Sequence, residues 1–479
     1  MGNIVHQDEI VQTQTSPGSG WKRLLEPAHA SVTIAISLGI ALYSFNEFFL
    51  STALPTTVAD IGGAKFMSWA YSVFLVLSII GGMVAARIYR SWDARTVLLA
   101  SAGLFVLGTT VTVLAPDMAW IIAGRAVQGI GLGVVVAVCY ILIPELIPRE
   151  LLPKIFGVEA AVWAFAAFAG PLIAGLVTEH VSWRAAFAIN VPMAAVFIVL
   201  VMRAMPKRSV GQATTADPVP LLRLGLTATG IVLVLLAGTI GTEWGLPVVL
   251  VAGLCLLAAV RIDRRAQLPI LPVGAFGIRS ALGAGLWVVL LMPFTEAAAA
   301  VYLVFGLQEL WGFGATFAGA VGALLAVGWS LTAVLVAMVD SRTMRIRLAV
   351  GGPVLLAAGM VVTTFGIADH RLEAVMAGHL LMGVGFGINW GPICQLLMEF
   401  GSPEDRARTS AMLPTLQAAG FALGAAIFGL VANAAGLSAE IDTQLLRGAL
   451  VMTFVAACAA GFLALLAGFM MWRYLTRTA

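Results

Sequence analysis

The sequence predicts an all-α membrane protein that crosses the bilayer fourteen times. Of its 479 residues, 60% are hydrophobic and only 11% are charged, whereas soluble domains carry about 25% charged residues. Apolar runs follow one another along the chain, each close to the roughly 20 residues that a helix needs to cross the hydrocarbon core. The fourteen runs begin near Ser31, Met67, Thr96, Met118, Ile155, Ser182, Leu222, Gly245, Ser280, Gly314, Leu348, Glu373, Thr409 and Gln444. If the seventh and eighth runs, at residues 222–240 and 246–260, did not cross, twelve spans would remain with the same end topology.

Basic residues are distributed unevenly between alternate loops. With the N-terminal tail in the cytoplasm, the outer loops would carry only Lys65, Arg184, Arg371 and Arg447, and the other loop Lys and Arg residues would be cytoplasmic. This positive-inside bias predicts an even number of spans with both termini in the cytoplasm, in a cell (inner or plasma) membrane. The first apolar run is too long for a signal-peptide core, and no A-x-A-like cleavage site follows it.

A polar stretch between Met205 and Pro220 divides the chain. We therefore expect a cytoplasmic tail over residues 1–30, a six-helix bundle over 31–205, a cytoplasmic linker over 206–221, two additional helices over 222–262, and a second six-helix bundle over 263–479. Parallel halves with a substrate site between them near the membrane midplane are a common plan of transporters.

Several classes of function lack their sequence signals. No basic run indicates nucleic-acid binding, and the four cysteines lie in apolar runs without the spacing of a metal site. The chain contains neither H-E-x-x-H nor G-x-S-x-G, and its five histidines are scattered. The sequence therefore predicts no enzyme activity, no cofactor, no metal and no nucleic-acid partner.

Five motifs occur in order along the first half of the chain. They are FLSTALPTTVADIGG at residues 49–63, GGMVAARIYRSWDAR at 81–95, GRAVQGIGLG at 124–133, AGPLIAG at 169–175 and SWRAAFAINVP at 182–192. Together they resemble the major facilitator superfamily and, within it, the fourteen-span drug/proton antiporters.

The resemblance rests on particular matches. In the fourth-helix signature R-x-x-Q-G-x-G, the matching residues are Arg125, Gln128 and Gly129. In the antiporter signature G-P-x-x-G-G they are Gly170, Pro171 and Gly175, with Ala174 replacing one glycine. In the loop motif G-x-x-x-D-R-x-G-R-[KR] they are Arg87 and Arg90, with Ala86 replacing the acid and Tyr89 the second glycine.

The resemblance implies a major facilitator fold of two six-helix bundles with two extra helices between them, in a monomer. It implies a secondary transporter that exports drugs or other small organic compounds in exchange for protons, by alternating access. The alternatives are an exporter or importer of one specific metabolite or lipid, and a membrane receptor that transports nothing. The family's usual first-helix aspartate is absent, since Asn46 occupies its position and Glu47 follows.

Glu47 and Arg125 are the first candidates for proton coupling. Glu47 lies eight residues before Pro55, which corresponds to about 12 Å along a helix. Arg125 lies at a similar depth in the antiparallel fourth span, so the two side chains could meet. Charged groups inside a membrane usually mark substrate or proton pathways. The alternative is a fixed structural ion pair.

The second half contributes further candidates. Glu296 is the only acid deep in its first span, beside Pro293, and could bind a proton or a cationic substrate, or be a hydrogen-bonded interior acid. Trp390 could stack on a flat aromatic or cationic compound, although packing is the alternative. The predicted substrate-binding set is Asn46, Glu296, Asn389, Trp390, Gln395 and Gln417. The predicted conformational set is Arg87, Arg90, Gln128, Gly129, Gly170, Pro171 and Gly175.

Overall fold

The computed structural model describes residues 20–24, 26–62, 67–205, 220–237, 242–313, 315–400, 402–436 and 443–477, and in these ranges it is helical without strands. The helices of the first half are α1 Gly20–Leu24, α2 Pro27–Ile61, α3 Met67–Ser91, α4 Ala94–Val113, α5 Met118–Leu146, η2 Arg149–Leu151, α6 Leu152–His180, α7 Trp183–Ala188 and α8 Asn190–Ala204. The helices of the second half are α9 Leu221–Ala237, α10 Thr242–Arg264, α11 Ala281–Trp311, α12 Ala315–Val336, α13 Arg342–Ala368, α14 Leu372–Met398, α15 Pro403–Ala434 and α16 Thr443–Arg477.

The predicted fold class is confirmed. Within the described ranges, thirteen helical segments are long and apolar enough to cross a membrane, and α9 contains a shorter apolar stretch, Leu221–Val234. Helices are the expected spanning element because each satisfies its own backbone polar groups away from water. The predicted sixth span is divided into α7 and α8 at Ile189. Most of the predicted tail and linker, and residues 238–240 of the seventh predicted span, lie outside the described ranges.

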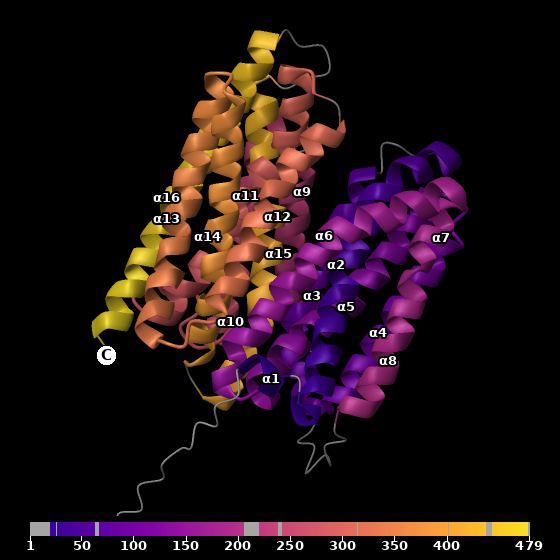
Figure 1. The fold of residues 1–479 in the computed structure, drawn as a ribbon, viewed down its shortest axis with the longest axis vertical. Helices are drawn as coiled ribbons and strands as arrows, with labels where there is room; N and C mark the ends of the chain where they lie inside the picture. Colours follow the sequence, from indigo (N-terminus) through magenta and orange to yellow (C-terminus); the bar gives the residue numbers. More distant parts are fainter. Residues whose placement is uncertain are drawn as a thin grey trace, which may run out of the picture.

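The helices form two bundles (Figure 1). The N-terminal bundle contains α2 to α8 and the C-terminal bundle contains α11 to α16. Several helices begin at side-chain caps, which satisfy the free N–H groups of the first turn. Examples are Asp93, whose carboxylate accepts from the Thr96 N–H at 3.0 Å, and Ser280, whose hydroxyl accepts from the Gly283 N–H at 3.0 Å.

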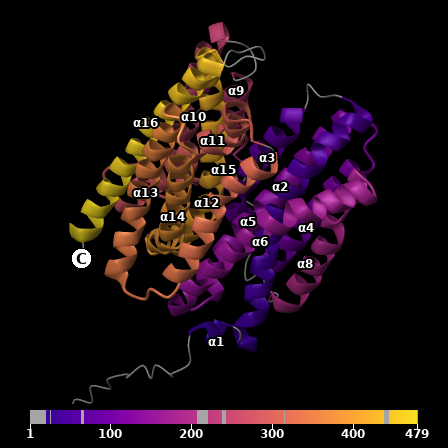
Figure 2. The same ribbon diagram turned by 45° about the horizontal axis from the view of Figure 1, so that its top comes forward.

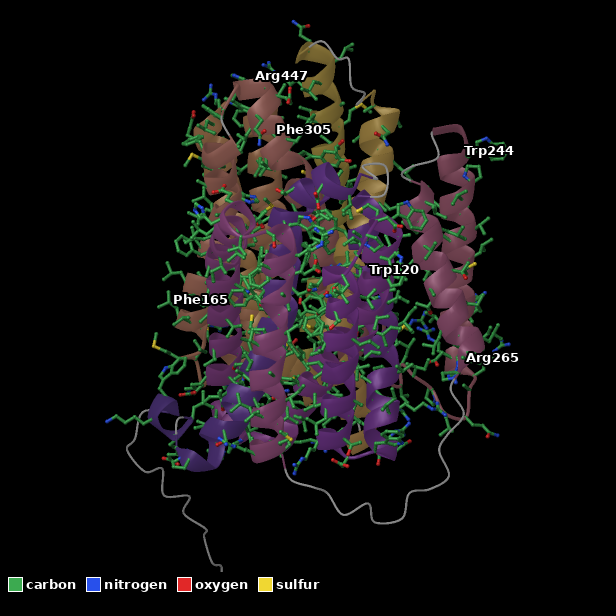
Figure 3. All side chains as sticks on the ribbon, turned by 90° about the vertical axis from the view of Figure 1, so that its right-hand side faces the viewer. Trp120, Phe165, Trp244, Arg265, Phe305 and Arg447 are labelled. Carbon is green, nitrogen blue, oxygen red and sulfur yellow. The ribbon has the colours of Figure 1, made fainter. Side chains whose placement is uncertain are left out.

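The two extra helices, α9 and α10, form a hairpin on one side of the boundary between the bundles. Ile231 of α9 belongs to the same buried apolar cluster as Val76 and Ile79 of α3 and Ala419 of α15. Figure 3 shows this hairpin at the side of the molecule, with Trp244 near one end and Arg265 near the other. The hairpin therefore contacts both bundles along the seam between α3 and α15.

The buried carboxylate of Asp263 fixes one end of the hairpin. It accepts a charge-assisted hydrogen bond from Arg223 of α9, and its two oxygens accept the backbone N–H groups of Ile270 and Leu271 at 2.9 Å each. Nearby, the guanidinium of Arg264 donates to the carbonyl oxygen of Ala275 at 2.6 Å. These contacts join the hairpin to the segment that leads into α11.

The bundles converge toward the end of the molecule where α1 and the C-terminal end of α16 lie, which we call the α1 end (Figures 1 and 2). Among the described residues, three polar contacts of side chains cross the boundary there: Lys154 Nζ lies 2.8 Å from Asp340 Oδ1, Ser330 donates to the carbonyl oxygen of Ala160 at 3.4 Å, and Trp390 Nε1 donates to the Tyr140 hydroxyl at 3.3 Å. We call these three pairs the inter-bundle seal. The ribbons diverge toward the opposite end.

The ion pair of the seal predicts a conformational effect. We expect Lys154→Ala to raise the ratio of conformations open at the α1 end to closed ones by about 1.4- to five-fold, since a partly exposed pair contributes about 0.2–1 kcal/mol. Electron–electron resonance between spin labels at Arg149→Cys and Met344→Cys, both exposed positions on opposite bundles, would measure this ratio.

A matched control is Arg371→Ala, because Arg371 pairs with Asp369 in the turn between α13 and α14, away from the seal. That variant should leave the distance distribution unchanged. Exchanging the charges, with Lys154→Asp and Asp340→Lys together, should restore the closed population. An unchanged distribution in Lys154→Ala would contradict the assignment of this pair to the seal.

Candidate functional site

Arg125 lies in α5 and is fully buried, yet each of its nitrogens has a partner. Nε donates to the carbonyl oxygen of Ala70 at 3.1 Å, Nη1 to Gln128 Oε1 at 3.1 Å, and Nη2 to Glu47 Oε1 at 3.0 Å. The guanidinium also lies 3.9 Å from the centre of the Phe74 ring. A planar group with several donors suits such a site. The predicted meeting of Glu47 and Arg125 is observed.

Further polar contacts extend from this pair, which we call the central ion pair. Gln128 Nε2 donates to the Thr109 hydroxyl at 2.9 Å, so the network joins α2, α3, α4 and α5. The Glu47 side chain keeps 22% of its surface accessible, whereas that of Arg125 keeps none. Glu47 is therefore the accessible member of the pair, and Arg125 is enclosed.

Glycines allow the close helix approach that the network requires. A methyl group on Gly129 would lie 2.5 Å from the Phe74 carbonyl oxygen, and one on Gly133 would collide with the Ser78 carbonyl oxygen. Small residues permit such backbone approach between membrane helices. Because α3 lies this close to α5, the Ala70 carbonyl comes within reach of Arg125.

The second glycine motif packs α6 against the helix that carries Glu47. A methyl group on Gly170 would lie 2.7 Å from Phe48 Cβ, and one on Gly175 would lie 3.7 Å from the Thr52 methyl carbon. Pro171 lies inside α6, next to this contact. The motif therefore packs α6 against the part of α2 that follows Glu47.

The loop motif at the end of α3 forms a contact with α5. The Tyr89 hydroxyl, at the position of the motif's second glycine, donates a hydrogen bond to Glu145. Ala86, in the position of the missing acid, is buried, whereas Arg87 is half-buried and Arg90 is exposed. The tyrosine thus joins the two helices near the α1 end.

Two predicted residues, Glu296 and Gln417, lie on helices of the C-terminal bundle, whereas the central ion pair lies in the N-terminal bundle. Glu296 is half-buried on α11, and among the described residues no hydrogen bond or ion pair joins it to Glu47 or Arg125. Gln417 of α15 is also half-buried. Asn46 is completely buried beside Glu47, and neither atom of its amide has a partner among the described residues.

The predicted residues of α14 point in two directions. The Asn389 amide donates to the Ala349 carbonyl oxygen of α13 at 2.5 Å, inside the C-terminal bundle. Trp390 and Gln395 instead line a small pocket at the seal, together with Phe156 of α6 and Ala337. Only the latter two therefore lie at the boundary between the bundles in this conformation.

Sequence reasoning missed a buried carboxylate in the middle of a predicted span. Glu159 of α6 is 1% exposed, its Oε1 accepts from the Ser37 hydroxyl at 3.3 Å, and its Oε2 is buried without a partner among the described residues. The sequence could have indicated this residue. Glu159 is the only acid between Ile155 and Val177, and an ionisable residue within a span is expected to be functional.

Comparisons with known proteins identify the family. The sequence profile of the Major Facilitator Superfamily matches residues 36–425. The chain belongs to the major facilitator superfamily. It is therefore a multi-pass membrane transporter and not an enzyme, and no group of potential metal ligands occurs among the residues that the structure describes.

Relatives and solved structures agree with this family. A probable multidrug-efflux transporter of Mycobacterium tuberculosis (strain H37Rv) is 29% identical over 95% of this chain and 97% of its own length. Multidrug resistance protein 3 of Bacillus subtilis (strain 168) is 22% identical over 84% and 79%. The human organic anion transporter MFSD10 superposes with a TM-score of 0.69 at 16% identity, covering 93% of this chain and all of its own. The proton:xylose symporter XylE has a TM-score of 0.64 at 17% identity, covering 93% and 95%. The two structures share the fold.

The close packing around the central ion pair predicts a stability difference between two glycines. We expect Gly129→Ala to lower the free energy of unfolding by about 1–3 kcal/mol, because the added methyl group meets a backbone carbonyl oxygen. Gly103→Ala on α4 is the control, since nothing lies within 4 Å of the added carbon, and there a gain of about 0.5–1 kcal/mol is expected. Thermal melting of the purified variants in detergent compares them, and equal melting temperatures would contradict the packing argument.

Proposed function

We propose that this transporter exports drugs or other small organic compounds in exchange for protons, by alternating access. The observation that carries the proposal is the central ion pair, which places a partly accessible carboxylate against a fully buried cation. The relatives whose names describe multidrug efflux or multidrug resistance support the substrate class. The basic loops support an orientation with the α1 end in the cytoplasm of a cell membrane, and the seal then makes this conformation an outward-facing one.

The proposed cycle uses the two states of Glu47. In this conformation a proton from the outer side binds the carboxylate and weakens its bond to Arg125, so a bound substrate leaves. The bundles then rock, the proton departs into the cytoplasm, and the restored anion is available to the next substrate. Because the proton and the substrate use the same carboxylate in turn, movement of one is coupled to movement of the other.

The proposed substrates are cationic or weakly basic organic compounds. Glu47 and Glu296 would supply negative charge from opposite bundles, and Gln417 would supply hydrogen bonds. Trp390 would supply an aromatic surface at the closed end, where cations can stack. Asn389 is left out of this set because its amide is engaged within the C-terminal bundle.

The proposal predicts the effect of neutralising Glu47. In proteoliposomes with an imposed pH gradient, Glu47→Gln should lower gradient-driven movement of a cationic dye more than about tenfold, because the amide cannot bind and release the proton that is exchanged for the substrate, and it leaves Arg125 without its anionic partner. Arg125→Lys should also be impaired, because an ammonium group cannot reach the three separate acceptors with the same geometry.

Glu150→Gln is the matched control, because this exposed glutamate pairs with Arg23 near the surface. It should transport as the unmodified protein does. Full gradient-driven transport in Glu47→Gln at several pH values would overturn the mechanism. Movement of one compound only, among unrelated dyes and metabolites, would favour the alternative of a specific exporter.

A further inference from the structure

Glu159 is a carboxyl group that the proposed cycle does not use. Among the described residues, the Ser37 hydroxyl is its one hydrogen-bond partner, and no cation lies within ion-pairing distance. Lys154, five residues earlier on the same helix, is engaged by Asp340 instead. A buried carboxylate is costly unless it is paired. With one oxygen unpartnered and no cation nearby, the neutral carboxylic acid is the form that this pocket accommodates.

The neighbouring helices supply no compensating charge. The titratable groups that face Glu159 are Cys139 and Tyr140 of α5, and α14 places Cys394 next to Tyr140. Helix α12 has no ionisable side chain between Ala315 and Val336. The remaining charged or titratable groups on elements that contact α6 lie further along α2 or α5 or near the helix ends: His29, Tyr43, Glu47, Asp60, Arg125, Glu145, Lys22, Arg23, Arg149, Glu150, Arg184, Glu373 and His379.

Glu159 is buried directly behind the inter-bundle seal. The next residue, Ala160, accepts the Ser330 hydrogen bond from α12. One turn earlier, Phe156 lies beside Tyr140, with ring centres 6.2 Å apart, and Tyr140 is the partner of Trp390. Two of the three pairs of the seal therefore border this carboxyl group, and separating the bundles at the α1 end would bring water close to it.

We propose that Glu159 is a proton-binding site whose occupancy controls closure of the α1 end. The seal closes over the neutral acid only. When the seal opens, the O–H bond of the acid breaks, the proton passes to water at the α1 end, and a hydrated carboxylate remains. Closure takes one proton back from the same compartment, which is the cytoplasm if the proposed orientation holds. The site is thus a pH-dependent element separate from the coupling at Glu47.

The linkage between proton binding and closure sets the expected pH response. If opening releases one proton, the ratio of open to closed molecules rises by up to tenfold per pH unit as the pH increases. Spin labels at Arg149→Cys and Met344→Cys, with Cys255 and Cys458 replaced by Ala, report this ratio in the purified full-length protein over a pH series.

Glu159→Gln should abolish the pH response, because the amide has nearly the same shape and stays neutral. Glu159→Met repeats the test with an apolar side chain of similar length. Ser37→Ala should retain the response, because it removes the hydrogen bond and leaves the carboxyl group. Glu150→Gln should also retain it. A response that survives in Glu159→Gln or Glu159→Met, or no response in the protein with Glu159 present, would overturn the proposal.

The test separates this inference from the proposed function. The spin-label measurement needs no transport, and Glu47→Gln should keep the pH response of the seal while it loses gradient-driven efflux. If Glu47→Gln transports normally while Glu159→Gln loses the pH response, the coupling mechanism fails and the proton site stands. If Glu47→Gln loses transport and the ratio of open to closed molecules does not change with pH in the protein with Glu159 present, the coupling mechanism stands and the proton site fails.

Discussion

The structure depends on the requirement that a cation buried in a membrane protein must have all of its donors satisfied. Arg125 meets it with a carbonyl oxygen, an amide oxygen, a carboxylate and an aromatic ring. These partners come from α2, α3 and α5, and Gln128 extends the network to α4. One guanidinium and its partners therefore join four helices of the N-terminal bundle. A fully apolar substitute could pack there, but it would leave Glu47 as an unpaired buried acid.

Arg125 reaches its partners only because the helices approach unusually closely. Gly129 and Gly133 place the backbone of α5 against carbonyl oxygens of α3, and without a water-driven force between helices such packing is a main source of association in a membrane. The buried charge thus depends on the glycines that bring its partners within reach, and both occur in the ten residues 124–133. The same residues that shorten the distance between helices also exclude water from the arginine.

The sequence alone predicted the features that depend on position along the chain, namely which segments are helical and how deep each side chain lies in its span. Span length located the helices, and equal depth in antiparallel spans predicted that Glu47 would meet Arg125. Rotation about a helix axis was harder to predict: Asn389 turns toward α13 while its neighbour Trp390 faces the other bundle. Contacts between bundles could not be predicted, since Lys154 and Asp340 are 186 residues apart and meet only after both bundles have formed. Glu159 was overlooked, although the rule that selected Glu47 applies to it equally.

The two sides of the boundary between the bundles are not equivalent. Along the seam between α3 and α15, the α9–α10 hairpin adds a further layer through Ile231 and its cluster. Along the seam between α6 and α12, no additional helix among the described residues covers the contact, and beyond Ala160 the side chains of Phe165, Phe168 and Leu172 on α6 are exposed. An amphiphilic compound moving sideways from the bilayer into the space between the bundles would meet the hairpin on the first side and only α6 and α12 on the second. Glu159 lies on α6, the helix that borders this second seam.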